Sequence, residues 1–221
     1  SLAAKDFVVE LEQEGLFLTE AVISGTRWPL KESTVPGKIT TISSEAIAFQ
    51  NPQTMADVLG SSGDVFIQKS QLGGGSPMIR GFAANRVLLV VDGVRMNTAI
   101  FRSGNLQNVI SLDPFTVDQT EVRFGPGSVL YGSDAIGGVM SFFTKSPQLD
   151  SSATGVSGNA ALRYASANFE KTGHFDFNIG GKKWAGFTSL TYTDFDDLRM
   201  GADGPEEYLR PTFVERRNEM D

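Results

Sequence analysis

Near the carboxyl end of the chain, three runs of residues alternate between the two faces of an extended strand, and this period of two constrains the fold more than any other feature. The runs are residues 159–165, 172–180 and 187–195. In the second run, one face is apolar and the other polar: Phe175, Phe177 and Ile179 alternate with His174, Asp176 and Asn178. Strands of roughly ten residues with this alternation are typical of a membrane β-barrel. A soluble β-sandwich gives a similar pattern, so both architectures stay open at this point.

Composition excludes several classes of protein. The 221 residues, 40% of them hydrophobic, suffice for one large domain or two small ones. The 24 glycines and 16 phenylalanines favour short strands and turns over a helical bundle. A net charge of −7 without a basic stripe makes nucleic acid a poor partner. Because the chain has no cysteine, thiol nucleophiles, zinc ribbons and disulfides are excluded.

The amino-terminal sequence and the apolar runs bear on location. The start SLAAKDFVVELEQ lacks the basic and apolar regions of a signal peptide, so the chain is expected to be cytosolic or an excised piece. The longest apolar run, residues 87–91, is far too short for a membrane helix. If a membrane is crossed, strands must cross it.

The middle of the chain predicts a compact α/β mixture. Thr54 followed by Asp57 has capping-box spacing and predicts a helix start, and Asp113-Pro114 predicts another helix cap. Asp92-Gly93 predicts a tight turn after a strand buried on both faces at residues 87–91. Further strands are expected at residues 38–42, 65–68, 94–96, 121–124 and 139–144.

Four motifs occur in order along the chain. They are LTEAVISGTR (residues 18–27), GGGSPMIRGF (73–82), RVLLVVDGVRMN (86–97) and TEVRFGPGSVLYGSDAIGGVMSFFTK (120–145). Together with the alternating strands, they make the chain resemble the plug domain and first barrel strands of a TonB-dependent outer-membrane receptor. The resemblance covers about residues 18–200 and implies an α+β fold, in which a mixed-sheet plug with short helices precedes antiparallel hairpins of a truncated transmembrane β-barrel.

The resemblance implies a domain order and a function. Residues 1–17 would end an upstream β-domain or linker, 18–28 would contain a TonB box, 29–148 would form the plug, and 149–221 would begin the barrel. The plug would gate uptake of a scarce ligand, with iron chelates, haem or cobalamin favoured, in the outer membrane. A whole barrel needs about 22 strands. The chain is therefore expected to be an amino-terminal piece whose barrel strands fold back onto the plug or pair between molecules.

Site residues follow from the same resemblance. The TonB-binding segment would be Glu20, Ala21, Val22, Ile23, Ser24 and Gly25, which could add to the edge of a partner's sheet. Two outward loops, residues 70–76 and 96–108, would face the ligand through Gln71, Asn97, Ile100, Phe101, Arg102 and Asn105. Arg80 and Glu121 would contact the barrel wall. The family usually has arginine directly before Gly-Pro, whereas this chain has Arg123 and then Phe124, so the usual locking arginine is in doubt.

Catalysis, cofactors and metals are not expected. No nucleophile is paired with a base, and neither glycine-rich run is followed by the Lys-Ser/Thr of a phosphate loop. The single histidine, His174, is expected to be a packed or lumenal residue, with a haem or metal ligand as the alternative. Two other functions stay open: a receptor that also signals, and an extracellular β-rich ligand-binding module that never meets a membrane.

Overall fold

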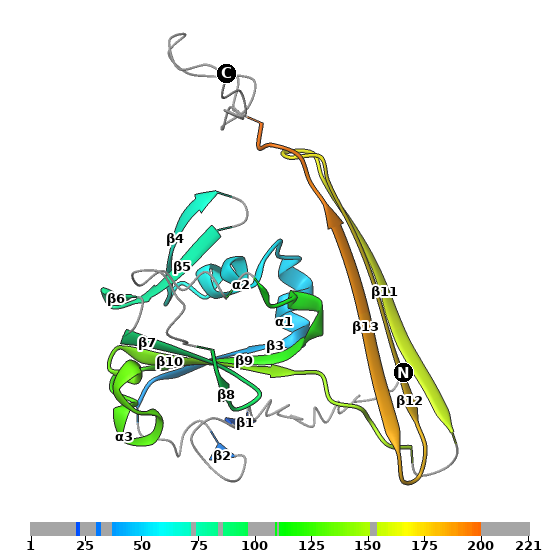
Figure 1. Ribbon diagram of the computed structural model, residues 1–221, viewed down its shortest axis with the longest axis horizontal. Coiled ribbons are helices and arrows are strands. Elements are labelled where there is room, and N and C mark those ends of the chain that lie inside the picture. The colour runs from blue at the N-terminus through cyan, green and yellow to red at the C-terminus, as the bar shows by residue number, and fades with distance from the viewer. Residues whose placement is uncertain are drawn as a thin grey trace, which may run out of the picture. The chain divides into compact units, whose positions relative to one another are not determined.

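The computed structural model describes residues 21–22, 30–31, 37–71, 74–83, 86–96, 109, 111–150 and 154–199 (Figure 1). The chain divides into two compact units, Ser1–Pro36 and Gly37–Asp221. In the first unit, β1 (Ala21–Val22) pairs antiparallel with β2 (Leu30–Lys31). All other described elements belong to the second unit, which contains a globular body (residues 37–144) and a separate long sheet.

A five-stranded mixed sheet forms the centre of the globular body. Its strands, in spatial order, are β3 (Ile39–Ser43), β9 (Val117–Phe124), β10 (Gly138–Thr144), β7 (Val87–Val91) and β8 (Val94–Arg95). Only β10 and β7 run parallel; the other neighbours are antiparallel. The predicted strands are confirmed with shifted ends, and β9 begins four residues earlier than expected.

Two short helices follow β3. The first, α1 (Ser44–Gln50), was not predicted; the Ser43 hydroxyl caps it by accepting from the N–H of Ala46, and Asn51 ends it in the left-handed region. The second, α2 (Met55–Ser61), begins at the predicted capping box. There the Asp57 carboxylate accepts hydrogen bonds of 3.0 Å and 2.9 Å from the N–H and hydroxyl of Thr54. The predicted cap at Asp113 is also confirmed, before the 3-10 turn Pro114–Thr116.

A three-stranded meander stands where the sequence predicted an outward loop at residues 70–76. Its strands are β4 (Phe66–Gln71), β5 (Gly74–Ile79) and β6 (Phe82–Ala83). Residues 70, 71 and 74–76 therefore lie in strands, and the loop prediction is wrong in extent. The cause is packing: a Cβ at Gly75 would lie 2.8 Å from the Cβ of Ala56, so the glycine lets β5 approach α2 closely.

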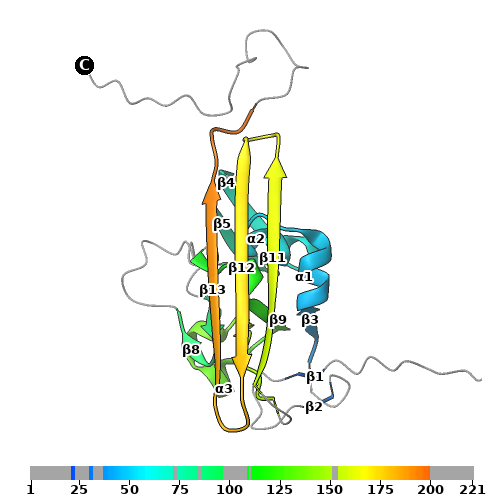
Figure 2. The same cartoon turned by 90° about the vertical axis from the view of Figure 1, so that its right-hand side faces the viewer.

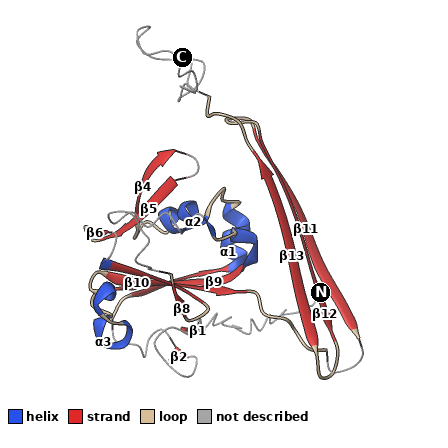
Figure 3. Ribbon diagram, in the orientation of Figure 1, coloured by secondary structure: helices blue, strands red, loops and turns tan. Residues whose placement is uncertain are grey.

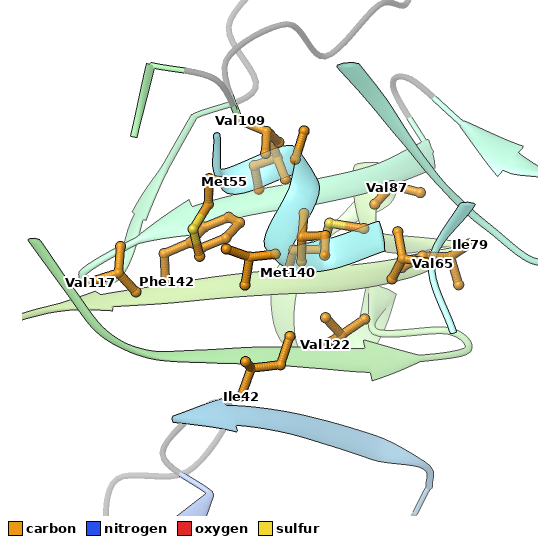
Figure 4. Close-up of a cluster of buried hydrophobic side chains, with 14 of the residues drawn as sticks. Ile42, Met55, Val65, Ile79, Val87, Val109, Val117, Val122, Met140 and Phe142 are labelled. Carbon is orange, nitrogen blue, oxygen red and sulfur yellow. The ribbon is translucent and has the colours of Figure 1, made fainter. Parts of the chain in front are cut away.

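The core lies between the helices and one face of the five-stranded sheet (Figures 3 and 4). Met55, Val58 and Leu59 of α2 are fully buried there. They belong to one cluster with Val122 of β9 and Phe142 of β10. On the opposite face, Leu88, Val90 and Val139 pack with Ala135 and Tyr131, beside the short helix α3 (Ser128–Tyr131). The strand β7 is thus buried on both faces, as predicted.

The long sheet consists of the three strands expected from the alternation. They are β11 (Gly155–Ala165), β12 (Glu170–Gly180) and β13 (Ala185–Asp194), and they pair antiparallel in that order (Figure 2). Along β12, Glu170, Thr172, His174 and Asp176 are buried. On the other face, large apolar side chains are exposed: Val156, Leu162, Tyr164, Phe175, Leu190 and Tyr192. The sheet therefore has a polar buried face and an apolar exposed face.

Candidate functional site: the seam between body and long sheet

The polar face of the long sheet contacts the globular body, and we call this contact the seam. Its members come from alternate positions of β11, β12 and β13, because residues two apart share one face of a strand. On the other side, the contacts come from the α1–α2 connection and the turn around Asp113 in the body, and from Lys145, which directly follows β10. Sequence periodicity predicted the polar face but gave no means of pairing it with these body residues.

Arg163 of β11 lies at the centre of the first contact. Its guanidinium forms an ion pair with the buried carboxylate of Glu170, with the Nε donating at 2.9 Å. A terminal nitrogen donates to the Thr172 hydroxyl at 3.2 Å, and Thr172 donates in turn to Glu170 at 2.8 Å. The other terminal nitrogen of Arg163 donates to the main-chain carbonyl of Pro52 in the body. One side chain thus joins two strands of the long sheet to the α1–α2 connection.

His174 of β12 forms the second contact. Its ring stacks on Phe115 of the body, with 4.5 Å between ring centroids and 13° between planes. The Nδ1 lies 2.7 Å from the Thr191 hydroxyl, and the Nε2 lies 3.2 Å from the Asp176 carboxylate. Thr191 also donates to the carboxylate of Asp113 in the body. Both ring nitrogens are engaged, which confirms the interpretation of His174 as a packed residue.

Lys145 and the segment after it form the third contact. The Lys145 ammonium lies 3.1 Å from the carboxylate of Asp176, which also accepts from the main-chain N–H and side-chain amide of Asn159 at 3.0 Å each. Further along, the amide of Asn178 pairs with both main-chain groups of Gln148, at 3.0 Å and 3.1 Å. A Cβ at Gly180 would lie 2.3 Å from the Gln148 carbonyl oxygen. Glycine is therefore needed for this close approach.

Two polar cavities lie along the seam. One, of about 380 Å³, lies between residues such as Thr54 and Asp113 of the body and Arg163, Thr172 and Thr193 of the long sheet. The other, of about 370 Å³, is lined by residues that include Lys145, Asn159, Asp176 and Asn178. Both have the size and the polar partners that ordered water needs. The seam is thus a set of separate anchor contacts with polar space between them, unlike the close-packed core.

The body matches a known family. A family model described as the TonB-dependent Receptor Plug Domain matches residues 31–139, which include β3, β7, β8 and β9 of the central sheet and the start of β10. The chain belongs to the TonB-dependent receptors. The fold is the expected one, a mixed-sheet plug with few helices followed by strand hairpins. The family assignment also places the chain in the outer membrane.

Two curated relatives show how far the similarity extends. The chain is 36% identical over 185 residues to the vitamin B12 transporter BtuB of Vibrio vulnificus, covering 81% of this chain and 29% of that protein. It is also 36% identical over 110 residues to a hemin receptor of Yersinia pestis, covering 49% and 16% respectively. The chain thus spans less than a third of the length of either relative.

Solved structures share the fold. The alcaligin outer-membrane receptor FauA from Bordetella pertussis superposes with a TM-score of 0.63 at 17% identity, over 80% of this chain and 30% of that one. The copper transporter OprC gives a TM-score of 0.62 at 20% identity, over 73% and 24%. At these identities the likeness concerns the fold alone.

The two predicted wall-contact residues of this TonB-dependent receptor differ in environment. Arg80 is exposed, adopts a positive φ of 49° in the β5–β6 turn, and places its guanidinium 5.6 Å from the centroid of the Phe124 ring. Glu121 is fully buried in β9 and accepts a 2.9 Å hydrogen bond from the side chain of Gln119. The contacts with β11–β13 described above involve other body residues, so a wall contact for Arg80 or Glu121 stays a prediction.

The remaining predicted sites fall mostly outside the described residues. Ala21 and Val22 lie in β1, opposite Lys31 and Leu30. The rest of the predicted TonB-binding segment lies outside the described residues: Glu20, Ile23, Ser24 and Gly25. The same holds for five ligand-facing predictions: Asn97, Ile100, Phe101, Arg102 and Asn105. Gln71 is the last residue of β4 and is paired with Gly74.

Two features are absent from the described ranges. No group of three or more histidine, aspartate or glutamate side chains there is arranged to hold a metal ion. No helix in the same ranges is both long and apolar enough to span a membrane.

Proposed function

We propose that the chain is the plug region and the first wall strands of a receptor that gates energy-dependent uptake of a scarce ligand across the outer membrane. The observation that carries the proposal is the seam: a globular body of the plug family is joined to a sheet whose polar face meets the body and whose apolar face is exposed. The orientation is the one that a barrel wall around a plug requires, with polar residues inward and apolar residues toward lipid.

The proposed partners follow from this role. The periplasmic domain of TonB would bind residues 20–25, while the complete barrel would hold the body and supply most of the ligand pocket. The pairing of β1 with β2 involves only two residues of each strand, and so short a hairpin is marginal on its own in water. A segment held this weakly can leave β2 and add to the sheet edge of a partner at little cost.

The proposed ligand is an iron chelate, haem or cobalamin, and the metal-bearing macrocycles haem and cobalamin are favoured. Support comes from the two curated relatives, one named a vitamin B12 transporter and the other a hemin receptor. The ligand would contact Gln71 and the loop of residues 97–105. We propose no catalytic role for the chain.

The partner is tested by calorimetric titration of the complete receptor, in detergent, with the periplasmic domain of TonB, beside a variant that lacks residues 20–25. We expect binding that the deletion abolishes. Equal binding by both proteins would place the contact elsewhere, and no binding by either, with or without ligand, would contradict the proposal.

The ligand is tested on the same purified receptor with cyanocobalamin, haemin and a ferric siderophore as separate probes. We expect saturable binding of one macrocycle, weakened at least about tenfold by Arg102→Ala together with Phe101→Ala, which corresponds to about 1.4 kcal/mol. Binding of the siderophore alone would overturn the preference for macrocycles while leaving the uptake role intact.

A further inference from the structure

We propose that Arg163 is a releasable lock that holds the α1–α2 connection of the globular body against the long sheet. The inference rests on the proposed function, in which the body must be held at rest and let go during transport. Arg163 would thus be a positioning residue in β11, one of the proposed wall strands. The chain lacks the arginine that the family usually has directly before Gly-Pro, since Phe124 stands there after Arg123.

The acceptor on the body is a main-chain carbonyl at a joint between helices. Pro52 stands between Asn51, which ends α1 in the left-handed region, and Thr54, which caps α2. The first residue of α2, Met55, is fully buried in the core. A hydrogen bond to Pro52 therefore holds the end of α1 and the start of α2 in place.

The donor keeps its charge neutralised without the body. Glu170, whose side chain is 1% exposed, pairs with Arg163 inside the long sheet, and Thr172 bonds to both. If the body moves away, Arg163 loses one carbonyl but keeps its counter-ion. Burying an unpaired charge is what makes most buried ion pairs costly to separate, and this arrangement avoids that cost.

Water can take the place of the lost carbonyl. The polar cavity of about 380 Å³ is lined by Arg163, Thr172 and Thr193 on one side and by Gln53 and Thr54 on the other. A water molecule in such a space makes nearly as good a hydrogen bond as the carbonyl does. The lock is specific in position, because the guanidinium donates to one body carbonyl. It is also reversible, because water can hydrogen-bond to both the Arg163 guanidinium and the Pro52 carbonyl after release.

The alternative is that Arg163 only stabilises the structure. Two substitutions distinguish the lock from this alternative, because each changes how often the α1–α2 connection opens. In Arg163→Gln the lock is lost, so the α1–α2 connection opens more often. In Glu170→Gln the arginine charge is left with the Pro52 carbonyl and neutral side chains, so leaving that carbonyl becomes harder and the connection opens less often. A purely structural role predicts more frequent opening in both variants.

The experiment is amide hydrogen exchange on the complete receptor without TonB or ligand, so that it does not depend on the uptake proposal. We expect exchange of residues 53–57 to rise at least about fivefold in Arg163→Gln and to fall in Glu170→Gln, with the amides of β12 unchanged. Arg163→Lys should restore part of the protection, because an ammonium still pairs with Glu170 and donates to a carbonyl.

The matched control is Arg199→Gln, since Arg199 is an exposed arginine that lies over the Phe169 ring and not against the body. It should leave exchange of residues 53–57 unchanged. Faster exchange of residues 53–57 in both Arg163→Gln and Glu170→Gln would contradict the lock. A similar change in exchange of the β12 amides would also contradict it, and Arg163 would then have only a stabilising role. If Arg163→Gln does not insert into membranes, Arg163→Lys takes its place. Exchange of residues 53–57 should then be faster than in wild type in Arg163→Lys and slower than in wild type in Glu170→Gln.

Discussion

Thr191, in the middle of β13, donates a hydrogen bond to the carboxylate of Asp113, which lies 78 residues earlier in the globular body. The same carboxylate group caps the 3-10 turn through the N–H of Phe115 at 2.9 Å. Body and long sheet therefore touch at a point where Asp113 is hydrogen-bonded within its own turn and Thr191 lies within β13. Such a point can be used to ask whether the body must move.

Cysteines at these two positions should stop transport. The side chains are in contact, and residues 1–221 contain no cysteine, so oxidation of Asp113→Cys with Thr191→Cys should join the body to β13 through a disulfide. We expect the oxidised complete receptor to lose uptake of its ligand by at least about tenfold and to regain it on reduction. Asp113→Cys with Thr188→Cys is the control, because Thr188 is exposed on the opposite face of the strand. Full uptake by the oxidised pair would mean that transport does not require this contact to open.

Gly138→Ala should destabilise the globular body. A Cβ at Gly138 would lie 2.7 Å from the carbonyl oxygen of Arg123 and 2.8 Å from the Cδ1 of Ile79. Overpacking of this kind costs about 1–3 kcal/mol. The measurement is the urea midpoint of protease resistance in the complete receptor. Gly186→Ala, where a Cβ would meet nothing within 4 Å, should leave the midpoint unchanged.

Asp64→Asn should lower stability at neutral pH but not in acid. Hydrogen bonds from Lys38 and then Thr40 lower the pKa of Asp64 below its ordinary value of 3.8. A lowered pKa in the folded state means that the carboxylate stabilises the fold fully above 3.8, and that this contribution is lost as pH falls through the folded value. The urea midpoints of wild type and variant should therefore differ at pH 7 and converge in acid, as pH falls from 3.8 through the lowered pKa of the folded state. If the midpoints differed equally at pH 7 and in acid, the carboxylate charge of Asp64 would not be the source of the stability. Asp197→Asn, at an exposed position, serves as the control.

Arg80 and Phe124 should be coupled. The guanidinium lies over the ring at 5.6 Å, and Lys38 lies over the same ring at 5.1 Å. A double-mutant cycle with Arg80→Gln and Phe124→Leu should give a coupling energy of about 0.5–1 kcal/mol, as expected for a cation–π pair whose cation is exposed; the Phe124 ring itself is buried. Strict additivity of the two substitutions would contradict a stabilising interaction between Arg80 and Phe124.

Leu190→Lys should impair insertion into the outer membrane. Leu190 is 72% exposed on the apolar face of β13, and a lysine facing the middle of a bilayer costs about 2–4 kcal/mol. Ser189→Lys, which places the charge on the other face, should have a different effect: it should disturb the seam and leave insertion intact. Insertion is read from the heat-modifiable mobility of the receptor in membranes. Normal insertion of Leu190→Lys would show that position 190 does not face the lipid.

The sequence was most informative where a structural rule acts within a few residues. The period of two in β11–β13, the capping box at Thr54 and the Asp113-Pro114 cap were all confirmed. The helix α1 was missed because seven residues give too little periodicity to recognise. The strand β5 was missed because glycine and proline are rare in strands, and its pairing depends on the close contact of Gly75 with Ala56.

The seam was missed for a different reason. Arg163 and His174 were visible as members of two alternating runs, yet their body partners Pro52 and Phe115 lie far away in sequence. No periodicity relates them, since the pairing is set by how the long sheet packs against the body. The sequence could have suggested only that so polar a strand face needs polar partners.

The place of β10 in the central sheet has a consequence for the order of events during synthesis. This last strand of the globular body lies between β9 and β7, and it is the neighbour through which they are joined. Until residues 138–144 have emerged, the earlier strands of this sheet can form only two separate ladders, β3 with β9 and β7 with β8, and the edges that β10 later joins carry unpaired main-chain groups. A nascent chain halted before Gly138 should therefore depend on a holdase to remain soluble, whereas one released after Thr144 can close its own sheet.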